Sequence, residues 1–195
     1  MTAGLIDEVL QRFGPKAAVT DPSDIQPWLT DWRGRFHGRS QAILSPGSTE
    51  EVAAIVRLAA EHRVPLVPQG GNTSMVGGAT PPADGSALIL SLRRMNRLRS
   101  IAPGAAVAEA GMILADLHEA GATSGQRFPL TLGARGSCTI GGLTATNAGG
   151  TQVLKFGTMR SLVLGLEAVL PDGSIHDGLS GLKKDNRGYN LDQLL

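Results

Sequence analysis

An uncharged, glycine-rich loop behind a short apolar strand is the feature that most constrains how this chain can fold. Residues 64–79 read Val-Pro-Leu-Val-Pro-Gln-Gly-Gly-Asn-Thr-Ser-Met-Val-Gly-Gly-Ala. Because glycine lacks a Cβ, its backbone can adopt a positive φ and approach a ligand closely, and successive N–H groups can form a concavity that favours an anion. The loop is therefore a candidate phosphate-binding loop, although a plain surface turn explains its composition equally well.

The residues before this loop predict a strand–helix–strand unit. A strand is expected at 42–44, and a Ser-x-x-Glu capping box at Ser48 and Glu51 begins a helix that ends near His62. A second strand at 65–68 completes a βαβ crossover. In open α/β sheets ligands bind at the carboxyl ends of the strands, and the glycine loop leaves the second strand at that end.

The rest of the chain alternates between helical and strand patterns. Residues 15–40, which are polar and interrupted by proline, are expected to form an irregular surface arm. Its arginines either lie in a solvated loop or meet an anionic substrate: Arg33, Arg35 and Arg39. Helices are expected at 5–13, 113–120 (ending at Gly121) and 140–148. Strands are expected at 87–92, 98–101, 105–110, 161–170 and 175–176, with hairpin turns at 103–104 and 171–174.

Composition excludes several classes of partner and site. The net charge is +1 and aromatic residues make up 4% of the chain, which argues against nucleic-acid binding. The single cysteine, Cys138, excludes an internal disulfide and a multi-cysteine zinc site, and we expect it to be a buried apolar residue. No secretory signal or membrane-spanning run is visible, so we expect a cytoplasmic location and no membrane span.

Common catalytic and nucleotide-binding motifs are also absent from the sequence. It contains no Gly-x-Gly, no Gly-Lys and no Gly-x-Ser-x-Gly, which excludes the Rossmann fingerprint, the Walker A loop and the hydrolase elbow. The four histidines stand singly, without metal-ligand spacing. No paired carboxylates suggest glycosidase chemistry.

A second glycine stretch at 128–150 resembles the first in chemistry. It reads Phe-Pro-Leu-Thr-Leu-Gly-Ala-Arg-Gly-Ser-Cys-Thr-Ile-Gly-Gly-Leu-Thr-Ala-Thr-Asn-Ala-Gly-Gly. Small residues of this kind let a backbone lie flat against a planar ring, and a tightly packed Gly/Ala helix is the alternative. Two such stretches in one small chain favour a ligand site more strongly than one.

Together these motifs resemble the FAD-binding domain of the vanillyl-alcohol oxidase/p-cresol methylhydroxylase (PCMH) superfamily. Within it the chain is most similar to the D-2-hydroxyacid dehydrogenases, which include D-2-hydroxyglutarate dehydrogenase, D-lactate dehydrogenase and the FAD subunit of glycolate oxidase. The resemblance begins near residue 30 and rests on segments 46–52, 68–78, 132–142, 146–150, 169–173 and 184–191.

The resemblance implies an α+β fold, a PCMH-type FAD-binding domain in which FAD lies between two α/β subdomains. Residues 1–39 are then an N-terminal helix and arm, 40–102 the first subdomain and 103–195 an incomplete second one. From the first subdomain it implies cofactor contacts by Pro68, Gln69, Gly70, Gly71, Asn72, Thr73, Ser74 and Gly77. From the second it implies contacts by Pro129, Gly133, Ala134, Gly136, Ser137, Thr139, Ile140, Gly141, Gly142, Thr146, Asn147, Gly150, Gly157 and Val169.

Two departures from the family pattern concern the cofactor and an arginine. Some relatives attach FAD covalently through a histidine of the first loop, where this chain has Asn72, or through a cysteine at a position that Cys138 does not match. FAD is therefore expected to bind non-covalently. Arg187 stands where the family often has a small hydroxyl residue, and either substrate or solvent would suit it.

The resemblance further implies an oxidoreductase that oxidises a D-2-hydroxy acid by hydride transfer to the flavin, with an electron acceptor that the sequence does not identify. The chain looks like a fragment, and no catalytic residue is assigned within it. A zinc or other divalent metal site is expected only in a missing C-terminal domain. The alternative is a truncated FAD- or nucleotide-binding module without turnover. A UDP-sugar reductase of the same superfamily is less favoured, because its NADPH-side features are absent.

Overall fold

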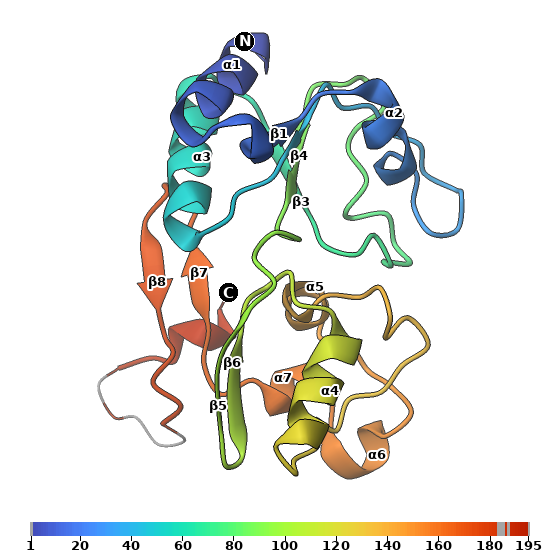
Figure 1. Ribbon diagram of the computed structural model, residues 1–195, viewed down its shortest axis with the longest axis vertical. Helices are drawn as coiled ribbons and strands as arrows, with labels where there is room; N and C mark the ends of the chain where they lie inside the picture. Colours follow the sequence, from blue (N-terminus) through green and yellow to red (C-terminus); the bar gives the residue numbers. More distant parts are fainter. Residues whose placement is uncertain (1, 183–185, 187, 195) are drawn as a thin grey trace.

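The computed structural model describes residues 2–182, 186 and 188–194, and it shows a mixed fold of helices and strands. Two lobes meet at mid-height in Figure 1. The upper one, the sheet lobe, contains α1 (Thr2–Phe13), β1 (Ala18–Val19), α2 (Pro22–Ile25), β2 (Ile43–Leu44), α3 (Thr49–Glu61), β3 (Leu66–Gln69) and β4 (Leu88–Ser91). The lower one, the helical lobe, contains β5 (Leu98–Ala102), β6 (Ala105–Ala108), α4 (Leu114–Thr123), α5 (Ile140–Ala145), α6 (Val153–Phe156) and α7 (Met159–Leu162).

The sheet of the sheet lobe has the strand order β1-β2-β4-β3. Strands β2, β4 and β3 are parallel, whereas β1 pairs antiparallel with β2. The predicted strand–helix–strand unit is present, but β4 lies between its two strands, so β2 and β3 are not neighbours. The carboxyl ends of the three parallel strands share one edge, and the loop that begins at Gly70 leaves from it.

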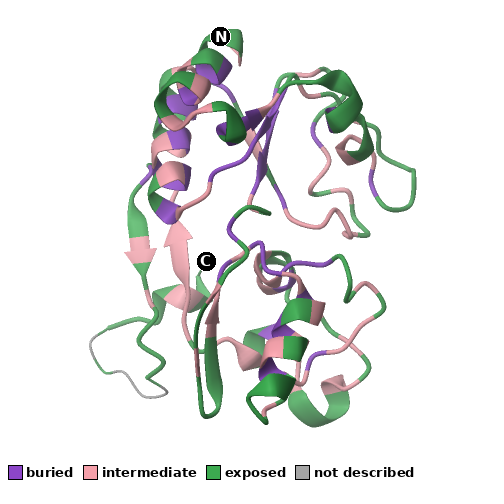
Figure 2. Ribbon diagram, in the orientation of Figure 1, coloured by how far each residue is buried: buried purple, intermediate pink, exposed green. Residues whose placement is uncertain are grey.

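Side chains alternate between the two faces of this sheet and build two separate cores. Leu44, Leu88 and Leu90 pack with α1 and α3 in one cluster, while Ile43 and Ile89 pack with α2 and Trp28 in another. This alternation is the period of two that a strand imposes. Figure 2 shows the buried residues concentrated on these strands and on the inner faces of α1 and α3.

The prediction of an irregular arm at 15–40 is wrong in part. The arm contains β1, α2 and two short 3₁₀ turns, at Pro15–Ala17 and Gln26–Trp28. Ala18 and Val19 pair with Leu44 and Ile43, so the arm adds an edge strand to the sheet. Two residues are too few to display a period, which is why the sequence pattern did not reveal this strand.

The predicted helix cap at Ser48 is confirmed in one of its two halves. The Ser48 hydroxyl accepts a hydrogen bond from the backbone N–H of Glu51 at 3.2 Å. The Glu51 carboxylate accepts from the N–H of Gly47 at 2.7 Å, rather than from that of Ser48 as a reciprocal capping box requires. The helix therefore begins where the sequence predicts it, and Glu51 ties down the preceding turn instead.

The helical lobe differs from the sequence prediction at two helix ends and at the start of one predicted strand. Helix α4 continues through Gly121 to Thr123, and Gly121 is buried inside it. Helix α5 ends at Ala145, before the predicted position 148. Residues 161 and 162, the start of the strand expected at 161–170, belong instead to α7, whose Met159 is buried in the core of this lobe. The hairpin of β5 and β6 around residues 103–104 is confirmed.

A C-terminal hairpin connects the end of the described chain back to the sheet lobe. Strands β7 (Glu167–Val169) and β8 (Ile175–Asp177) pair antiparallel, as predicted for a turn at 171–174. The hairpin lies against α3 (Figure 1), where Arg57 donates to the carbonyl of Gly173 at 2.6 Å and Thr49 donates to the Glu167 carboxylate at 2.5 Å. A short 3₁₀ turn at Leu191–Gln193 follows.

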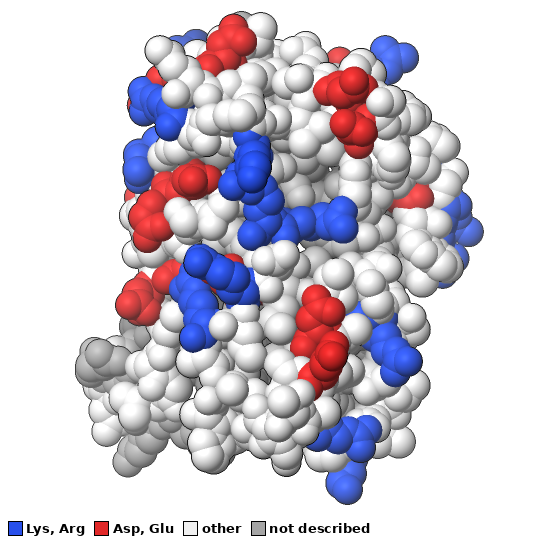
Figure 3. Space-filling view, viewed as in Figure 1, with Lys and Arg blue, Asp and Glu red and all other residues white. Residues whose placement is uncertain are grey.

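Charges of both signs are interspersed on the face shown in Figure 3, with basic side chains gathered across its middle.

A carboxylate network joins the hairpins at the junction of the lobes. The side chain of Glu109 is fully buried and pairs with Arg97 at 2.9 Å and Arg99 at 3.4 Å, and Arg99 pairs with Glu167 at 3.0 Å. The network thereby links β5 and β6 to β7.

Three further sequence expectations concern a membrane span, the motif at 184–191 and the subdomain boundaries. Within the described ranges, none of the helices has the length and apolar character needed to cross a membrane. Arg187 and part of the 184–191 motif lie outside the described residues. The predicted subdomain boundaries at residues 40 and 103 stay a prediction.

Candidate functional site

The two glycine stretches lie in direct contact, although about 60 residues separate them. A Cβ added to Gly71 would lie 1.8 Å from the carbonyl oxygen of Ser137, and one added to Gly70 would lie 2.2 Å from Oγ1 of Thr139. Real Cβ atoms do not approach other atoms this closely, so only glycine fits at both positions. In Figure 1 the first loop runs along the lower edge of the sheet lobe, above the segment that leads into α5.

Thr139 brings a buried hydroxyl group to this contact. The residue is 2% exposed, and its Oγ1 has no hydrogen-bond partner among the described atoms. A buried polar group without a partner is rare and costs about 1–3 kcal/mol. The segment is held in place by an isolated antiparallel bridge between Ile113 and Thr139. The hydroxyl therefore fits a site that a polar ligand completes.

The first loop, residues 70–79, offers a ligand more backbone than side chain. Asn72 has a φ of 52°, which asparagine tolerates better than most residues, and its Nδ2 donates to the carbonyl of Thr30 at 2.8 Å. The buried Gln69 donates to the carbonyls of Trp28 and Ala79 at 3.1 and 2.8 Å. These two amides shape the loop. The predicted cofactor contacts of Pro68, Thr73, Ser74 and Gly77 stay a prediction.

The second segment has open backbone beside the contact. An added Cβ at Gly133 or Gly136 would meet no atom within 4 Å. Gly141 and Gly150 instead pack against neighbouring backbone, at Ala110 and Thr131. The open positions allow a flat group to approach the chain, whereas the packed ones fix its path.

Several other predicted residues have structural partners in this arrangement. The Thr146 hydroxyl donates to the carbonyl of Gly142 at 2.8 Å, and the Asn147 side chain accepts from the N–H of Arg160 at 2.9 Å. Ala134 and Ile140 pack against the core of the helical lobe. Val169 packs against the cluster formed by α1 and α3. The cofactor contacts predicted for these residues, and for Pro129 and Gly157, stay a prediction.

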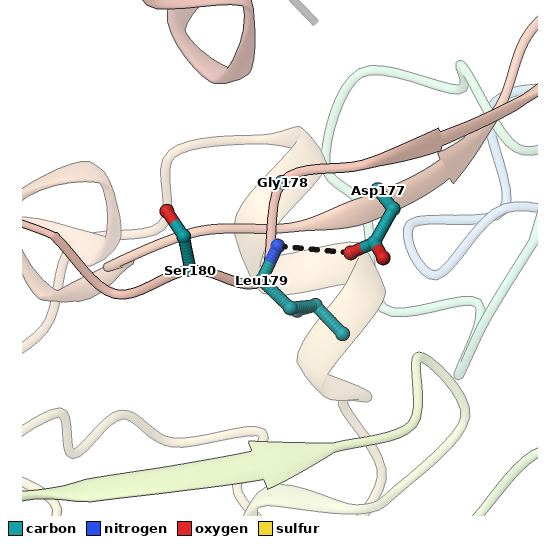
Figure 4. Close-up of a pocket in the computed structure, with 4 residues that line it drawn as sticks. All are labelled: Asp177, Gly178, Leu179 and Ser180. Carbon is teal, nitrogen blue, oxygen red and sulfur yellow. Dashed lines mark hydrogen bonds between the residues drawn. The ribbon is translucent and has the colours of Figure 1, made fainter. Parts of the chain in front are cut away.

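Two surface cavities do not coincide with the glycine stretches. One of about 420 Å³ is lined by Asp177, Gly178, Leu179 and Ser180, where the Asp177 carboxylate accepts from the N–H of Leu179 at 3.2 Å (Figure 4). Another, of about 340 Å³, lies beside Trp28 and Arg93, whose guanidinium carbon is 4.5 Å from the centre of the indole ring. Neither contains residues that the sequence singled out as ligands.

Cys138 is 3% exposed in the core of the helical lobe, and burial raises the pKa of its thiol, which confirms its expected apolar role. Among the described residues, no group of three His, Cys, Asp or Glu side chains is placed to hold a metal ion.

A model of the family described as "FAD binding domain" matches residues 40–178, a range that includes both glycine stretches. The chain belongs to the FAD binding domain family. The close contact at Gly70 and Gly71 and the Thr139 hydroxyl, whose hydrogen-bonding capacity no described atom uses, both lie inside the matched range.

Curated relatives of this FAD-binding domain extend well beyond it. The chain is 46% identical over 187 residues to mitochondrial D-2-hydroxyglutarate dehydrogenase of Bos taurus, which covers 95% of this chain and 34% of the relative. It is 40% identical over 175 residues to D-2-hydroxyglutarate–pyruvate transhydrogenase of Saccharomyces cerevisiae, and this match covers 89% of this chain and 35% of the relative. The chain thus spans about a third of the length of these relatives.

Solved structures confirm the predicted PCMH-type α+β fold. An alkyldihydroxyacetonephosphate synthase superposes with a TM-score of 0.85 at 21% identity, covering 100% of this chain and 37% of that one. p-Cresol methylhydroxylase has a TM-score of 0.75 at 19% identity, and the match covers 100% of this chain and 41% of that one. At these identities the two structures show the fold alone. The 4-ethylphenol oxidase of Gulosibacter chungangensis has a TM-score of 0.74 at 28% identity, covering 98% and 39%.

Two residues of the turn beside the first glycine loop were not singled out from the sequence. Asp31 is buried, and Phe36 lies with its ring against Gly77, yet both belong to the segment that was expected to be an irregular arm. The available signal was the Asp-x-x-Gly pattern at residues 31–34, because aspartate before glycine favours a turn closed by its own carboxylate.

Proposed function

We propose that this domain binds FAD non-covalently at the contact between its two glycine stretches and forms the cofactor-binding part of an oxidoreductase acting on D-2-hydroxy acids. The observation that carries the proposal is the approach of Gly70 and Gly71 to the 137–139 segment beside the unpartnered Thr139 hydroxyl. Membership of the FAD binding domain family supports the same cofactor.

Each glycine stretch would contact a different part of FAD. Backbone N–H groups of the 70–77 loop would hold the pyrophosphate, since this loop contains no lysine or arginine. The backbone around Gly133 and Gly136 and the hydroxyl of Thr139 would serve the flavin side. When bound, FAD supplies the redox chemistry as a hydride acceptor, while the protein binds and orients it.

The proposed substrate class follows from the relatives. Both curated relatives described above are named for D-2-hydroxyglutarate, a small 2-hydroxy acid. The reaction would transfer a hydride from the hydroxyl-bearing carbon to the flavin, and the electrons would pass to an acceptor that we do not assign. A general base and a divalent metal site are proposed only for sequence beyond this domain, so the domain alone is expected to bind without turnover.

An FAD titration combined with a dye assay tests both parts of the proposal. Quenching of flavin fluorescence should show saturable binding of FAD by the 195-residue chain. With D-2-hydroxyglutarate, D-lactate or glycolate and an artificial dye acceptor, the chain alone should not reduce the dye. Failure to bind FAD would contradict the proposal, and dye reduction by this chain would contradict the placement of the catalytic groups elsewhere.

The mode of attachment gives a separate prediction. Asn72 offers no nucleophilic side chain for a covalent bond to the flavin, and the Cys138 thiol is enclosed by core side chains with a raised pKa. Precipitating the holoprotein with acid should therefore release essentially all of the flavin into the supernatant, as absorbance at the flavin band would show. Flavin that stays with the pellet would contradict non-covalent binding.

A cytoplasmic location stays a prediction for this chain. The bovine relative is named as a mitochondrial protein, which concerns that protein alone. Imaging of the tagged protein in its own cells would decide the location.

A further inference from the structure

The segment from Trp28 to His37, which we call the brace, forms a compact turn beside the first glycine loop. Thr30 and His37 form an isolated antiparallel bridge, and the N–H of Gly38 donates to the carbonyl of Leu29 at 2.7 Å. The N–H of Asp31 donates to the carbonyl of Phe36 at 3.1 Å, which closes the turn across its base.

The Asp31 carboxylate fills the inside of the brace. One of its oxygens accepts from the N–H groups of Arg35 and Phe36 at 2.7 and 2.6 Å, and the other accepts from the N–H of Arg33 at 3.1 Å. Asp31 is 5% exposed, and the bond from Phe36 contributes most to lowering its pKa below the ordinary value. A buried carboxylate with three backbone donors is a strong local anchor.

The brace in turn holds the first glycine loop along its length. Gln69 and Asn72 donate to the carbonyls of Trp28 and Thr30. The Phe36 ring lies where a Cβ on Gly77 would meet it at 2.6 Å, and Nε of Arg33 lies 3.1 Å from Sδ of Met75. Contacts therefore extend from the start of the loop to its closing glycine.

We propose that Asp31 is a positioning residue for the cofactor, because its carboxylate fixes the brace and the brace fixes the loop that receives the pyrophosphate. The proposal rests on the proposed function, since it takes residues 70–77 as the pyrophosphate loop. Asp31 itself contacts backbone of its own turn, so its effect on FAD passes through the loop. Preorganised loops bind more tightly because less conformational freedom is lost on binding.

Asp31→Asn and Asp31→Ala test this role by graded removal of the anchor. Asparagine keeps one oxygen acceptor but places an NH₂ group opposite an N–H donor, and alanine removes all three bonds. The dissociation constant for FAD should rise about tenfold for asparagine and about a hundredfold for alanine. The ³¹P resonances of bound FAD at saturation should shift in Asp31→Asn, a change that a purely structural role would not produce.

Two further variants keep the test decisive. Asp21→Asn is the matched control, because Asp21 also accepts a backbone bond, from Ser23 at 2.8 Å, but on the exposed start of α2. It should bind FAD as the wild type does. Phe36→Ala removes a half-exposed ring from Gly77 but keeps the backbone N–H groups that donate to the Asp31 carboxylate. It should raise the dissociation constant at least about threefold.

The outcomes separate the inference from the proposed function. Failure of the wild type to bind FAD would refute the proposed function. Wild-type affinity and an unchanged ³¹P spectrum in Asp31→Asn would overturn the positioning role, as would an equal loss in Asp21→Asn. If Asp31→Asn does not fold, as thermal unfolding without FAD would show, Phe36→Ala decides, and its unchanged affinity would overturn the role.

Discussion

Gly71→Ala should separate the two glycine stretches, lowering the free energy of unfolding by about 3 kcal/mol and weakening FAD binding at least a hundredfold. The new Cβ would lie 1.8 Å from the carbonyl oxygen of Ser137, 2.7 Å from its carbon and 3.2 Å from Cα of Cys138. All three atoms are backbone, so no side-chain rotation relieves the overlap. Urea unfolding and an FAD titration measure the two effects.

A second substitution at the same contact distinguishes backbone from side-chain overlap. An alanine at Gly70 would meet Oγ1 of Thr139 at 2.2 Å, but the next nearest atom, Cβ of Thr139, is 3.4 Å away. Thr139→Ala should therefore restore about 2 kcal/mol of stability to Gly70→Ala and nothing to Gly71→Ala. Equal rescue of both variants would contradict the contact. Gly78→Ala, which meets nothing within 4 Å, is the stability control.

Glu109→Ala should cost about 2–3 kcal/mol of stability, because it removes a buried carboxylate and its hydrogen bonds to two arginines, which can still reach solvent. The side chain of Glu109 is 0% exposed and accepts bonds from the N–H and the guanidinium of Arg97, each at 2.9 Å. Its loss would also free Arg99, which holds Glu167 of the C-terminal hairpin. Urea unfolding at neutral pH measures the change.

The same network predicts how this difference depends on pH. Burial raises the pKa of Glu109, but the hydrogen bonds and charge of Arg97, with a bond from Arg99, lower it more, so it lies below its ordinary value. A lowered carboxyl pKa contributes stability above the unfolded value of about 4.3, and this contribution is lost as pH falls through the folded pKa. The difference between wild type and Glu109→Ala should therefore shrink from pH 7 to about pH 3.

An exposed glutamate supplies the control for both measurements. Glu61→Ala, at the exposed end of α3, should change stability by less than about 0.5 kcal/mol at either pH. A loss in Glu109→Ala no larger than that of Glu61→Ala would show that the buried network does not stabilise the junction of the lobes.

Much of the fold could be predicted where the signal lies within a few neighbouring residues. The Ser48 cap and the turns of both hairpins mark element ends by local chemistry, and these elements are present. The place of β4 between β2 and β3 depends on pairing between distant strands, which no local pattern contains. The apolar pattern at 161–170 predicts one strand, but its first two residues end helix α7, whose Met159 is buried in the core of the helical lobe.

The proximity of the two glycine stretches could be predicted, whereas the residues that support the first loop could not. The resemblance placed both glycine stretches in one site, and the contact of Gly70 with Thr139 brings them together. The brace was missed because charged residues around Asp31 suggest a solvated loop, whereas its carboxylate is buried against backbone N–H groups. Burial of a single carboxylate depends on the folded surroundings and leaves no period in the sequence.

The C-terminal hairpin also governs the order in which the chain can fold. Its contacts with α3 join residues 118 and 116 positions apart, from Thr49 to Glu167 and from Arg57 to Gly173. During synthesis the first lobe therefore emerges from the ribosome well before the segment that covers α3. Such distant contacts slow folding and leave apolar surface exposed meanwhile. The contacts that cover α3 can therefore form only after the hairpin has been synthesised.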